Sequence, residues 1–162
     1  MLIMEEIRPL ANDDEARRCA AMMCATEPWI TIGRTFDESL AIVQDPAQEI
    51  YVAVDGDQLL GFILIVMRGA FTGYIRSICV DGSARSRGIG TKLMNFAEQR
   101  IFRDSPNVFL CVSSFNPRAR ALYERLGYEF VGELKNYIID GASEFIMRKT
   151  IGPLRGRAPR RT

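Results

Sequence analysis

The feature that most constrains the fold is a glycine-rich, basic turn between an apolar strand and an amphipathic helix. The strand ends at Val80, and glycines follow at Gly82, Gly88 and Gly90. One helical face comes next, formed by Ile89, Leu93, Phe96, Ala97 and Ile101. Free backbone N–H groups at the positive end of a helix suit phosphate, and glycine lets a ligand approach the backbone closely. The turn therefore predicts a pyrophosphate site.

Apolar periodicity and turn residues predict the other elements. We expect strands at 3–9, 49–54, 58–67, 72–80, 107–112, 128–131 and 143–149. We expect helices at 12–23, at 89–101 and at 116–126, and a loop at 27–36. Residues 12–14 should cap the first helix, and Thr35 should cap another helix through a capping box with Glu38. Asp55-Gly56-Asp57 is typical of a hairpin turn between two of the strands. Strands and helices in this order predict an α/β fold with a mixed sheet.

The chain of 162 residues has the length of one domain, which we place at 1–150, followed by a basic and flexible tail at 151–162. The tail holds four arginines and no acid, so the preceding 150 residues have three more acidic than basic side chains. That excess argues against a nucleic-acid-binding protein, the reading that the tail alone would favour. No apolar run reaches the ~20 residues that span a bilayer, and Glu5 and Glu6 are unlike a signal peptide. We therefore expect a cytoplasmic protein with no membrane partner, and leave a homodimer open.

Residue counts exclude several chemistries. The chain has no histidine, which excludes His-based catalytic triads and most zinc sites, so we expect no metal. Its four cysteines form no C-x-x-C pair and are expected to be reduced thiols. The turn also lacks the spacing of a P-loop or of a dinucleotide-binding fingerprint. The turn is then either a site for a different phosphate-containing ligand or a glycine-rich helix start that binds no ligand.

Two segments together resemble the GCN5-related N-acetyltransferase (GNAT) superfamily. Arg85-x-x-Gly88-x-Gly90 after a strand is similar to its acetyl-CoA signature. Residues 116–128 are similar to its second motif, N-x-x-A-x-x-L-Y-x-x-x-G-F/Y. The close resemblance covers 75–132, and the order of elements fits from 3 to 149. It implies a mixed, mostly antiparallel central sheet flanked by helices, and an enzyme that transfers an acetyl group from acetyl-CoA to a primary amine by direct attack.

The resemblance also implies roles for residues. The pantetheine arm would lie along the backbone of Ile78, Cys79 and Val80. The pyrophosphate would be held by the turn, made of Arg85, Ser86, Arg87, Gly88, Ile89, Gly90 and Thr91. Asn116 would bind the pantetheine arm and Tyr123 would protonate the leaving thiolate. The alternatives are that Asn116 only caps a helix and that Tyr123 is a packed core residue.

The acceptor and the general base are left open. Glu27, Trp29 and Arg34 lie in the loop expected to border the acceptor, with a plain surface loop as the alternative. A branch that acetylates ribosomal protein N-termini has a glutamate in an L-E-V strand, where this chain reads Leu110-Cys111-Val112. Glu27 and Glu49 are the remaining candidate bases. The missing glutamate keeps a non-catalytic acyl-CoA-binding or sensor module as the alternative, and the acceptor can be a small molecule or a protein N-terminus.

Overall fold

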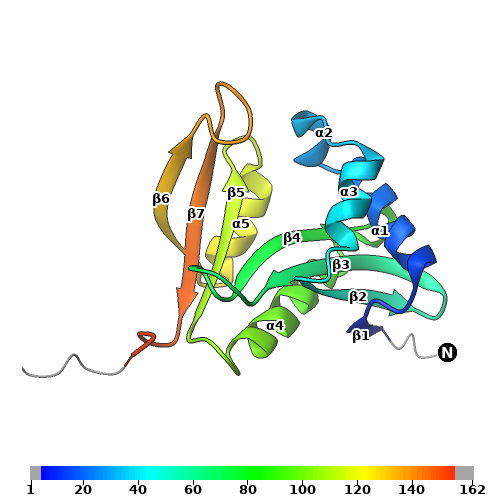
Figure 1. Ribbon diagram of the computed structural model, residues 1–162, viewed down its shortest axis with the longest axis horizontal. Coiled ribbons are helices and arrows are strands. Elements are labelled where there is room, and N and C mark those ends of the chain that lie inside the picture. The colour runs from blue at the N-terminus through cyan, green and yellow to red at the C-terminus, as the bar shows by residue number, and fades with distance from the viewer. Residues whose placement is uncertain (1–4, 156–162) are drawn as a thin grey trace, which may run out of the picture.

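The computed structural model describes residues 5–155 and contains a seven-stranded sheet (Figure 1). The strands lie side by side in the order β1-β2-β3-β4-β5-β7-β6. Their bounds are β1 Glu6–Pro9, β2 Glu49–Asp55, β3 Gln58–Val66, β4 Tyr74–Val80, β5 Asn107–Ser113, β6 Glu129–Lys135 and β7 Ser143–Thr150. Within 5–155 only the β4–β5 pair is parallel. The expected mixed, mostly antiparallel sheet is confirmed.

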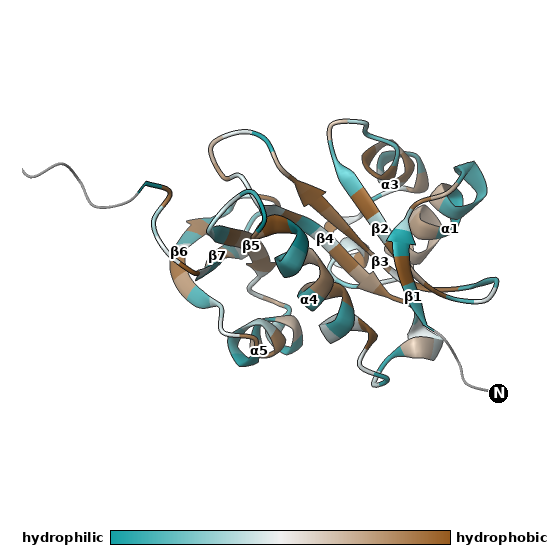
Figure 2. Cartoon of the chain, turned by 90° about the horizontal axis from the view of Figure 1, so that it is seen from below, coloured by the Kyte–Doolittle hydropathy of each residue, from teal (hydrophilic) through white to brown (hydrophobic). Residues whose placement is uncertain are grey.

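Helices cover both faces of the sheet. The helices α1 (Asp13–Cys24) and α3 (Phe36–Val43) pack on one face over a buried cluster that includes Phe62 and Leu64. The helices α4 (Ile89–Ile101) and α5 (Pro117–Arg125) pack on the other face over a cluster that includes Ile63. Figure 2 shows the apolar central strands between these helix layers. Alternate side chains of β3 thus supply two separate cores, which explains its nearly continuous apolar sequence.

Local signals set most element boundaries. The side chain of Asn12 accepts a hydrogen bond from the Glu15 N–H at 2.9 Å and begins α1. Thr35 and Glu38 form the expected capping box at the start of α3. The loop expected at 27–36 is wrong in part, because it contains a one-turn helix, α2 (Trp29–Ile32), where Trp29 packs into the core. The strand expected from residue 72 begins at Tyr74.

Two predicted segments lie partly outside the described residues. The first strand was expected from residue 3, and residues 1–4 are not described. Most of the basic tail, 156–162, also lies outside the described part. In the range 5–155, none of the helices is both long and apolar enough to span a membrane.

The sheet opens in the middle, and this opening positions the site. The β4–β5 ladder contains only the pairs Tyr74–Phe109 and Ile75–Leu110. Beyond Ile75, the ladders pair β4 with β3 alone, so the edge of 76–80 that faces β5 has no strand beside it. A free strand edge presents unpaired N–H and C=O groups, which an extended ligand can use.

Candidate active site

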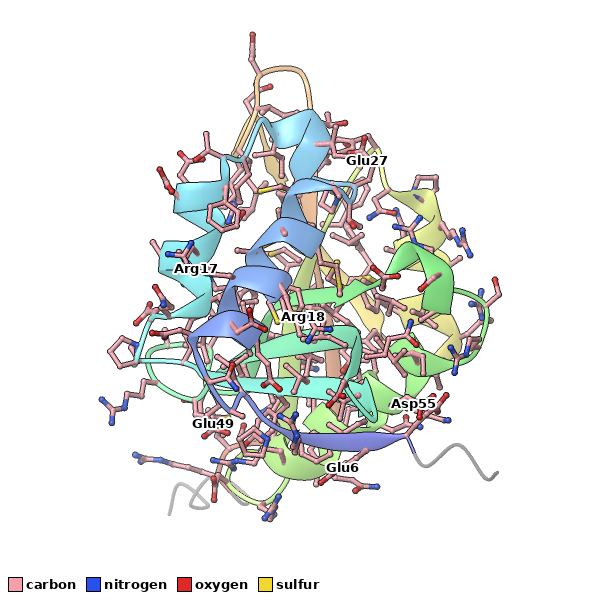
Figure 3. All side chains as sticks on the ribbon, turned by 90° about the vertical axis from the view of Figure 1, so that its right-hand side faces the viewer. Glu6, Arg17, Arg18, Glu27, Glu49 and Asp55 are labelled. Carbon is pink, nitrogen blue, oxygen red and sulfur yellow. The ribbon has the colours of Figure 1, made fainter. Side chains whose placement is uncertain are left out.

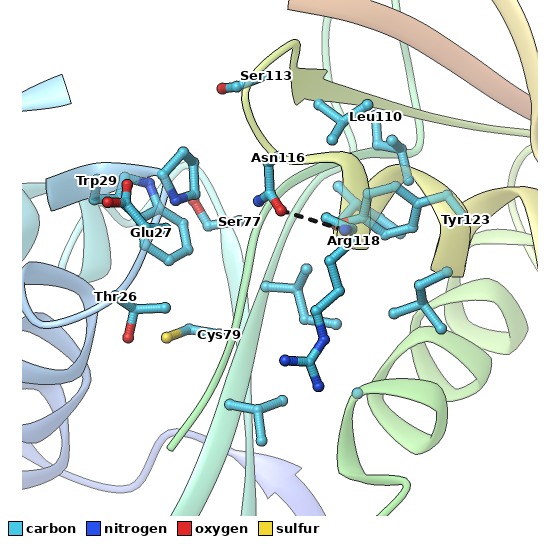
Figure 4. A pocket seen from close by; sticks show the side chains of 18 of the residues that line it. Thr26, Glu27, Trp29, Ser77, Cys79, Leu110, Ser113, Asn116, Arg118 and Tyr123 are labelled. Atoms are coloured by element: carbon cyan, nitrogen blue, oxygen red, sulfur yellow. Dashed lines mark hydrogen bonds between the residues drawn. The ribbon is translucent and has the colours of Figure 1, made fainter. Parts of the chain in front are cut away.

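A cleft of about 980 Å³ lies where β4 and β5 separate. Its lining runs from the turn before α4 to the loop between β6 and β7, which contributes Tyr137 and Ile138. Figure 4 shows Glu27 and Trp29 across the cleft from Tyr123. The cleft therefore joins the two sequence regions expected to bind donor and acceptor.

The turn before α4 presents backbone N–H groups. Asp81 begins a short 3-10 helix, η1 (Gly82–Ala84), by accepting hydrogen bonds from Ser83. Ser86 (φ 64°) and Gly88 (φ 81°) both adopt the left-handed conformation. Gly88 is the N-cap of α4, and no side chain caps this helix, so its first N–H groups have no side-chain acceptor. This geometry suits an anion.

Six of the seven turn residues expected to bind pyrophosphate line the cleft: Arg85, Ser86, Gly88, Ile89, Gly90 and Thr91. Arg87 does not line it. The Arg87 guanidinium instead lies 3.2 Å from the Glu5 carboxylate, which also pairs with Lys92. The structure therefore does not place Arg87 in the cleft lining; its guanidinium pairs with Glu5, the residue before β1.

The strand residues Ile78, Cys79 and Val80 line the cleft, as expected. Burial raises the pKa of the Cys79 thiol to about 11, so this thiol stays protonated near neutral pH. Its side chain packs with the core beneath α1. The open backbone edge, rather than these side chains, is therefore what β4 offers an extended ligand.

Asn116 and Tyr123 also line the cleft. The Asn116 Oδ1 accepts a hydrogen bond from the Ala119 N–H at 3.2 Å, so Asn116 does cap α5 (Figure 4). Its amide NH₂ group makes no hydrogen bond to residues 5–155 and can still serve a ligand. The Tyr123 ring is 7% exposed and packs edge-on against Tyr128 at 6.0 Å. Burial raises the pKa of Tyr123 to about 12, which keeps its hydroxyl available as a proton donor.

The three residues expected at the acceptor end, Glu27, Trp29 and Arg34, all line the cleft. Trp29 is only 7% exposed, so it both packs in the core and borders the cleft. Glu27 is exposed and accepts the Thr31 N–H at 3.2 Å. Burial, and then the nearby Arg76, lowers the pKa of Arg34.

Glu49, one of the two candidate bases, lies elsewhere. Its carboxylate receives two hydrogen bonds from Arg100 of α4, at 2.6 and 2.8 Å, and one from the Tyr51 hydroxyl at 2.8 Å. It is not part of the cleft lining. Figure 3 shows Glu49 and Glu27 near opposite ends of the molecule. The hypothesis that Glu49 is a base is therefore wrong.

A carboxylate that the sequence analysis missed lies in the cleft. Glu144 is the second residue of β7, is 5% exposed and lines the cleft. The Ser113 hydroxyl donates a hydrogen bond to Glu144 Oε1 at 2.5 Å. Burial raises the pKa of Glu144. The sequence feature that could have pointed to Glu144 is an acidic residue directly before the apolar run Phe145-Ile146-Met147.

Comparisons with known proteins agree with this architecture. The sequence profile described as the Acetyltransferase (GNAT) family matches residues 13–128. The N-alpha-acetyltransferase RimI of Mycobacterium tuberculosis is 30% identical over 146 residues, which cover 85% of this chain and 88% of that protein. The solved structure of an aminoglycoside 6'-acetyltransferase type Ii is 27% identical, with a TM-score of 0.74 over 91% of this chain and 98% of that one. An aminoglycoside 6'-N-acetyltransferase complexed with coenzyme A is 25% identical, with a TM-score of 0.75 over the same shares. The chain belongs to the GNAT acetyltransferase family.

Proposed function

We propose that this protein transfers the acetyl group of acetyl-CoA to the α-amino group of a peptide or amino acid. Acetyl-CoA-dependent N-acetylation of an amine follows from membership of the family and from the relatives described above. The choice of an α-amine is the new element. It rests on one observation, the combination of carboxylates and guanidinium groups that line the cleft.

Two acidic side chains, Glu27 and Glu144, and five arginines line the cleft. Arg34 and Arg76 are two of these arginines. A peptide N-terminus brings one ammonium group next to carbonyl oxygens, which the carboxylates and guanidiniums can bind respectively. A polycationic amine would instead meet two positive side chains, and their repulsion would weaken its binding.

The acidity of the amine points the same way. At pH 7, deprotonating an α-amine with a pKa near 8 costs about 1.4 kcal/mol, whereas a lysine-type amine costs about 4–5 kcal/mol. An α-amine therefore needs less help from the protein. Relatives in Mycobacterium tuberculosis, Saccharolobus solfataricus and Schizosaccharomyces pombe are named N-alpha-acetyltransferases, which supports this choice.

The geometry of the cleft supports a donor half of the site. The open edge of β4 at 78–80 would hold the pantetheine arm, with Asn116 adding its free amide NH₂. The backbone of the turn 85–91 would hold the pyrophosphate. Acetyl-CoA supplies an activated thioester. The hydroxyl of Tyr123 would donate a proton to the departing sulfur, as its raised pKa allows.

The acceptor is identified by thiol release from acetyl-CoA with a panel of amines. The panel contains peptides with different N-terminal residues, free amino acids, spermidine and an aminoglycoside, and mass spectrometry locates the added acetyl group. We expect the highest kcat/KM with α-amines. Turnover that is limited to the polycations would contradict the proposal.

A polycationic small amine is the second candidate, because two of the structural relatives are aminoglycoside acetyltransferases. The same panel decides between the two classes. The sensor-module alternative predicts binding of acetyl-CoA without turnover of any amine. The reason for the sensor-module alternative was a missing carboxylate, and the presence of Glu144 in the cleft weakens that reason.

Four further features remain proposals. We place the protein in the cytoplasm, as a single domain over 1–150 followed by a basic tail. We expect it to act without nucleic acid or a membrane. A homodimer is compatible with the exposed apolar side chains of Phe130 and Val131 on the edge strand β6.

A further inference from the structure

Glu144 is a buried carboxylate without a cationic partner. It is 5% exposed, and within residues 5–155 it forms no ion pair. Its one hydrogen bond there comes from the Ser113 hydroxyl to Oε1, which leaves Oε2 without a protein donor. Burying an unpaired carboxylate is costly, so such groups are rare unless they have a use.

The surroundings of Glu144 are neutral at pH 7. Tyr74 of β4, Cys111 of β5 and Tyr137 of the β6–β7 loop are the titratable groups around it, and burial raises the pKa of Tyr74 and of Cys111. The β6 residue that pairs with Glu144 is Leu134. Arg34 and Arg76 line the cleft, but neither pairs with Glu144. Because no residue in 5–155 forms an ion pair with Glu144, a cationic group of the ligand can compensate its charge.

Strand register places this carboxylate at the acceptor end. Glu144 pairs with Ser113 across β5 and β7, and Ser113 ends the strand that diverges from β4. Both residues line the cleft, on the side where Tyr137 and Ile138 also contribute. An amine that approaches from the β6–β7 loop can therefore reach the carboxylate.

We propose that Glu144 binds the acceptor's ammonium group and takes one of its protons before attack. This inference rests on the proposed function. The freed amine nitrogen then forms a bond to the acetyl carbon while the carbon–sulfur bond breaks. The sulfur receives a proton from Tyr123, and the nitrogen's second proton restores the Tyr123 hydroxyl. Glu144 finally releases its proton to water, so one proton leaves per acetyl group transferred.

The test begins with Glu144→Gln and a matched control, Glu133→Gln. Glu133 lies on β6, is exposed, accepts a hydrogen bond from Ser143 and does not line the cleft. With the best acceptor, we expect Glu144→Gln to lower kcat/KM at pH 7 by about 10²–10⁴-fold and to regain rate as pH rises and free amine accumulates. The control should keep wild-type rates. Equal rates and pH profiles for wild type and Glu144→Gln would overturn the proposal.

A second variant tests whether the pH profile belongs to Glu144. Ser113 stabilises the ionised carboxylate, so Ser113→Ala should raise the pKa of Glu144. The acid limb of kcat/KM should move to higher pH while the plateau changes little. If the acid limb does not move, it reports the ionisation of a group other than Glu144. If Glu144→Gln does not fold, Glu144→Asp replaces it, and we expect a reduced rate with the acid limb retained.

A measurement without either substrate gives an independent readout. Because the folded-state pKa of Glu144 is raised, wild type loses stability as pH rises from the ordinary carboxyl pKa to the raised value. The Glu144→Gln variant does not lose stability in this way, because glutamine does not ionise. We expect the Tm of Glu144→Gln minus that of wild type to increase between pH 4 and pH 8. A constant difference would show that the buried carboxylate carries no ionisation penalty and would overturn the proposal.

The outcomes separate this inference from the proposed function. Turnover of α-amines at equal rates by wild type and Glu144→Gln leaves the proposed function standing and removes Glu144 as the base. Turnover of polycations alone removes the α-amine proposal, and the same variants then decide on Glu144 with that substrate. A wild type that binds acetyl-CoA but acetylates no amine overturns both.

Discussion

The two ends of the cleft are built in different ways. The end proposed to hold phosphate is a continuous segment, 81–91, that offers mainly backbone N–H groups. The acceptor end combines side chains from separate parts of the chain, including Glu27, Arg76, Tyr137 and Glu144. A backbone site depends on conformation, whereas a side-chain site changes with each substitution. The first end can therefore hold one donor in many related proteins, and the second can change its acceptor.

The largest effect is expected at the phosphate end. Gly88→Asp places a carboxylate at the N-cap of α4, where the pyrophosphate should lie, and repels it. We expect acetyl-CoA to lose its stabilising effect on Tm entirely. Gly88→Asn is the control, because asparagine has the same shape, tolerates φ 81° and carries no charge. If Gly88→Asp kept the full shift in Tm, the turn would not be the phosphate site.

The same contrast explains what the sequence could predict. The hairpin at Asp55-Gly56-Asp57, the caps at Asn12 and Thr35 and the turn before α4 depend on neighbouring residues, and all were predicted. The helix α2 was missed because four residues between Pro28 and Gly33 have little helical tendency of their own. Packing of Trp29 into the core stabilises it instead.

The candidate base Glu144 could not be predicted from the sequence for the same reason. The sequence showed no acid in the strand segments 74–77 and 110–112, and it could not show what lies beside them in space. The register of β5 and β7 brings Glu144 next to Ser113, 31 residues away. In the same way, β1 brings Glu5 to Arg87, which the motif alone assigned to phosphate. Contacts between distant strands were the information that local patterns lacked.

Tyr123 connects the two ends, and its hydroxyl gives the next largest effect. Tyr123→Phe should slow acetyl transfer by about 10²-fold, the low end for loss of a general acid, because a thiolate is a fairly stable leaving group. The dissociation constant of acetyl-CoA should not change, since the ring still packs against Tyr128. Single-turnover rates with the best acceptor measure this. An unchanged rate together with lower stability would make Tyr123 a core residue only.

A smaller effect is expected from Arg34 at the acceptor end. Arg34→Gln removes a guanidinium that can bind an acceptor carbonyl, a charged hydrogen bond of about 1.5 kcal/mol, so KM for the acceptor should rise about tenfold. Affinity for acetyl-CoA and kcat should stay constant. Arg17→Gln is the control, because Arg17 is exposed on α1 and does not line the cleft. A change in acetyl-CoA affinity would show that the two ends are not separate.

The smallest effect on activity is expected from Glu49, and this makes it the sharpest comparison with Glu144. Both are glutamates on strands next to the edges of the sheet, but Glu49 pairs with Arg100 on the α4 face, whereas Glu144 forms no ion pair within residues 5–155. Glu49→Gln breaks a partly exposed ion pair, so the free energy of unfolding should fall by about 1 kcal/mol, or about 2–4 °C in Tm. Both kcat and KM should stay at wild-type values, because no atom of Glu49 reaches the cleft. Thermal unfolding and steady-state kinetics on the same preparations measure both effects. Glu49 should contribute to stability and not to catalysis, as a structural carboxylate does. Glu144 should contribute to catalysis and lower stability, as a functional carboxylate does. A loss of rate in Glu49→Gln as large as in Glu144→Gln would mean that both act through folding.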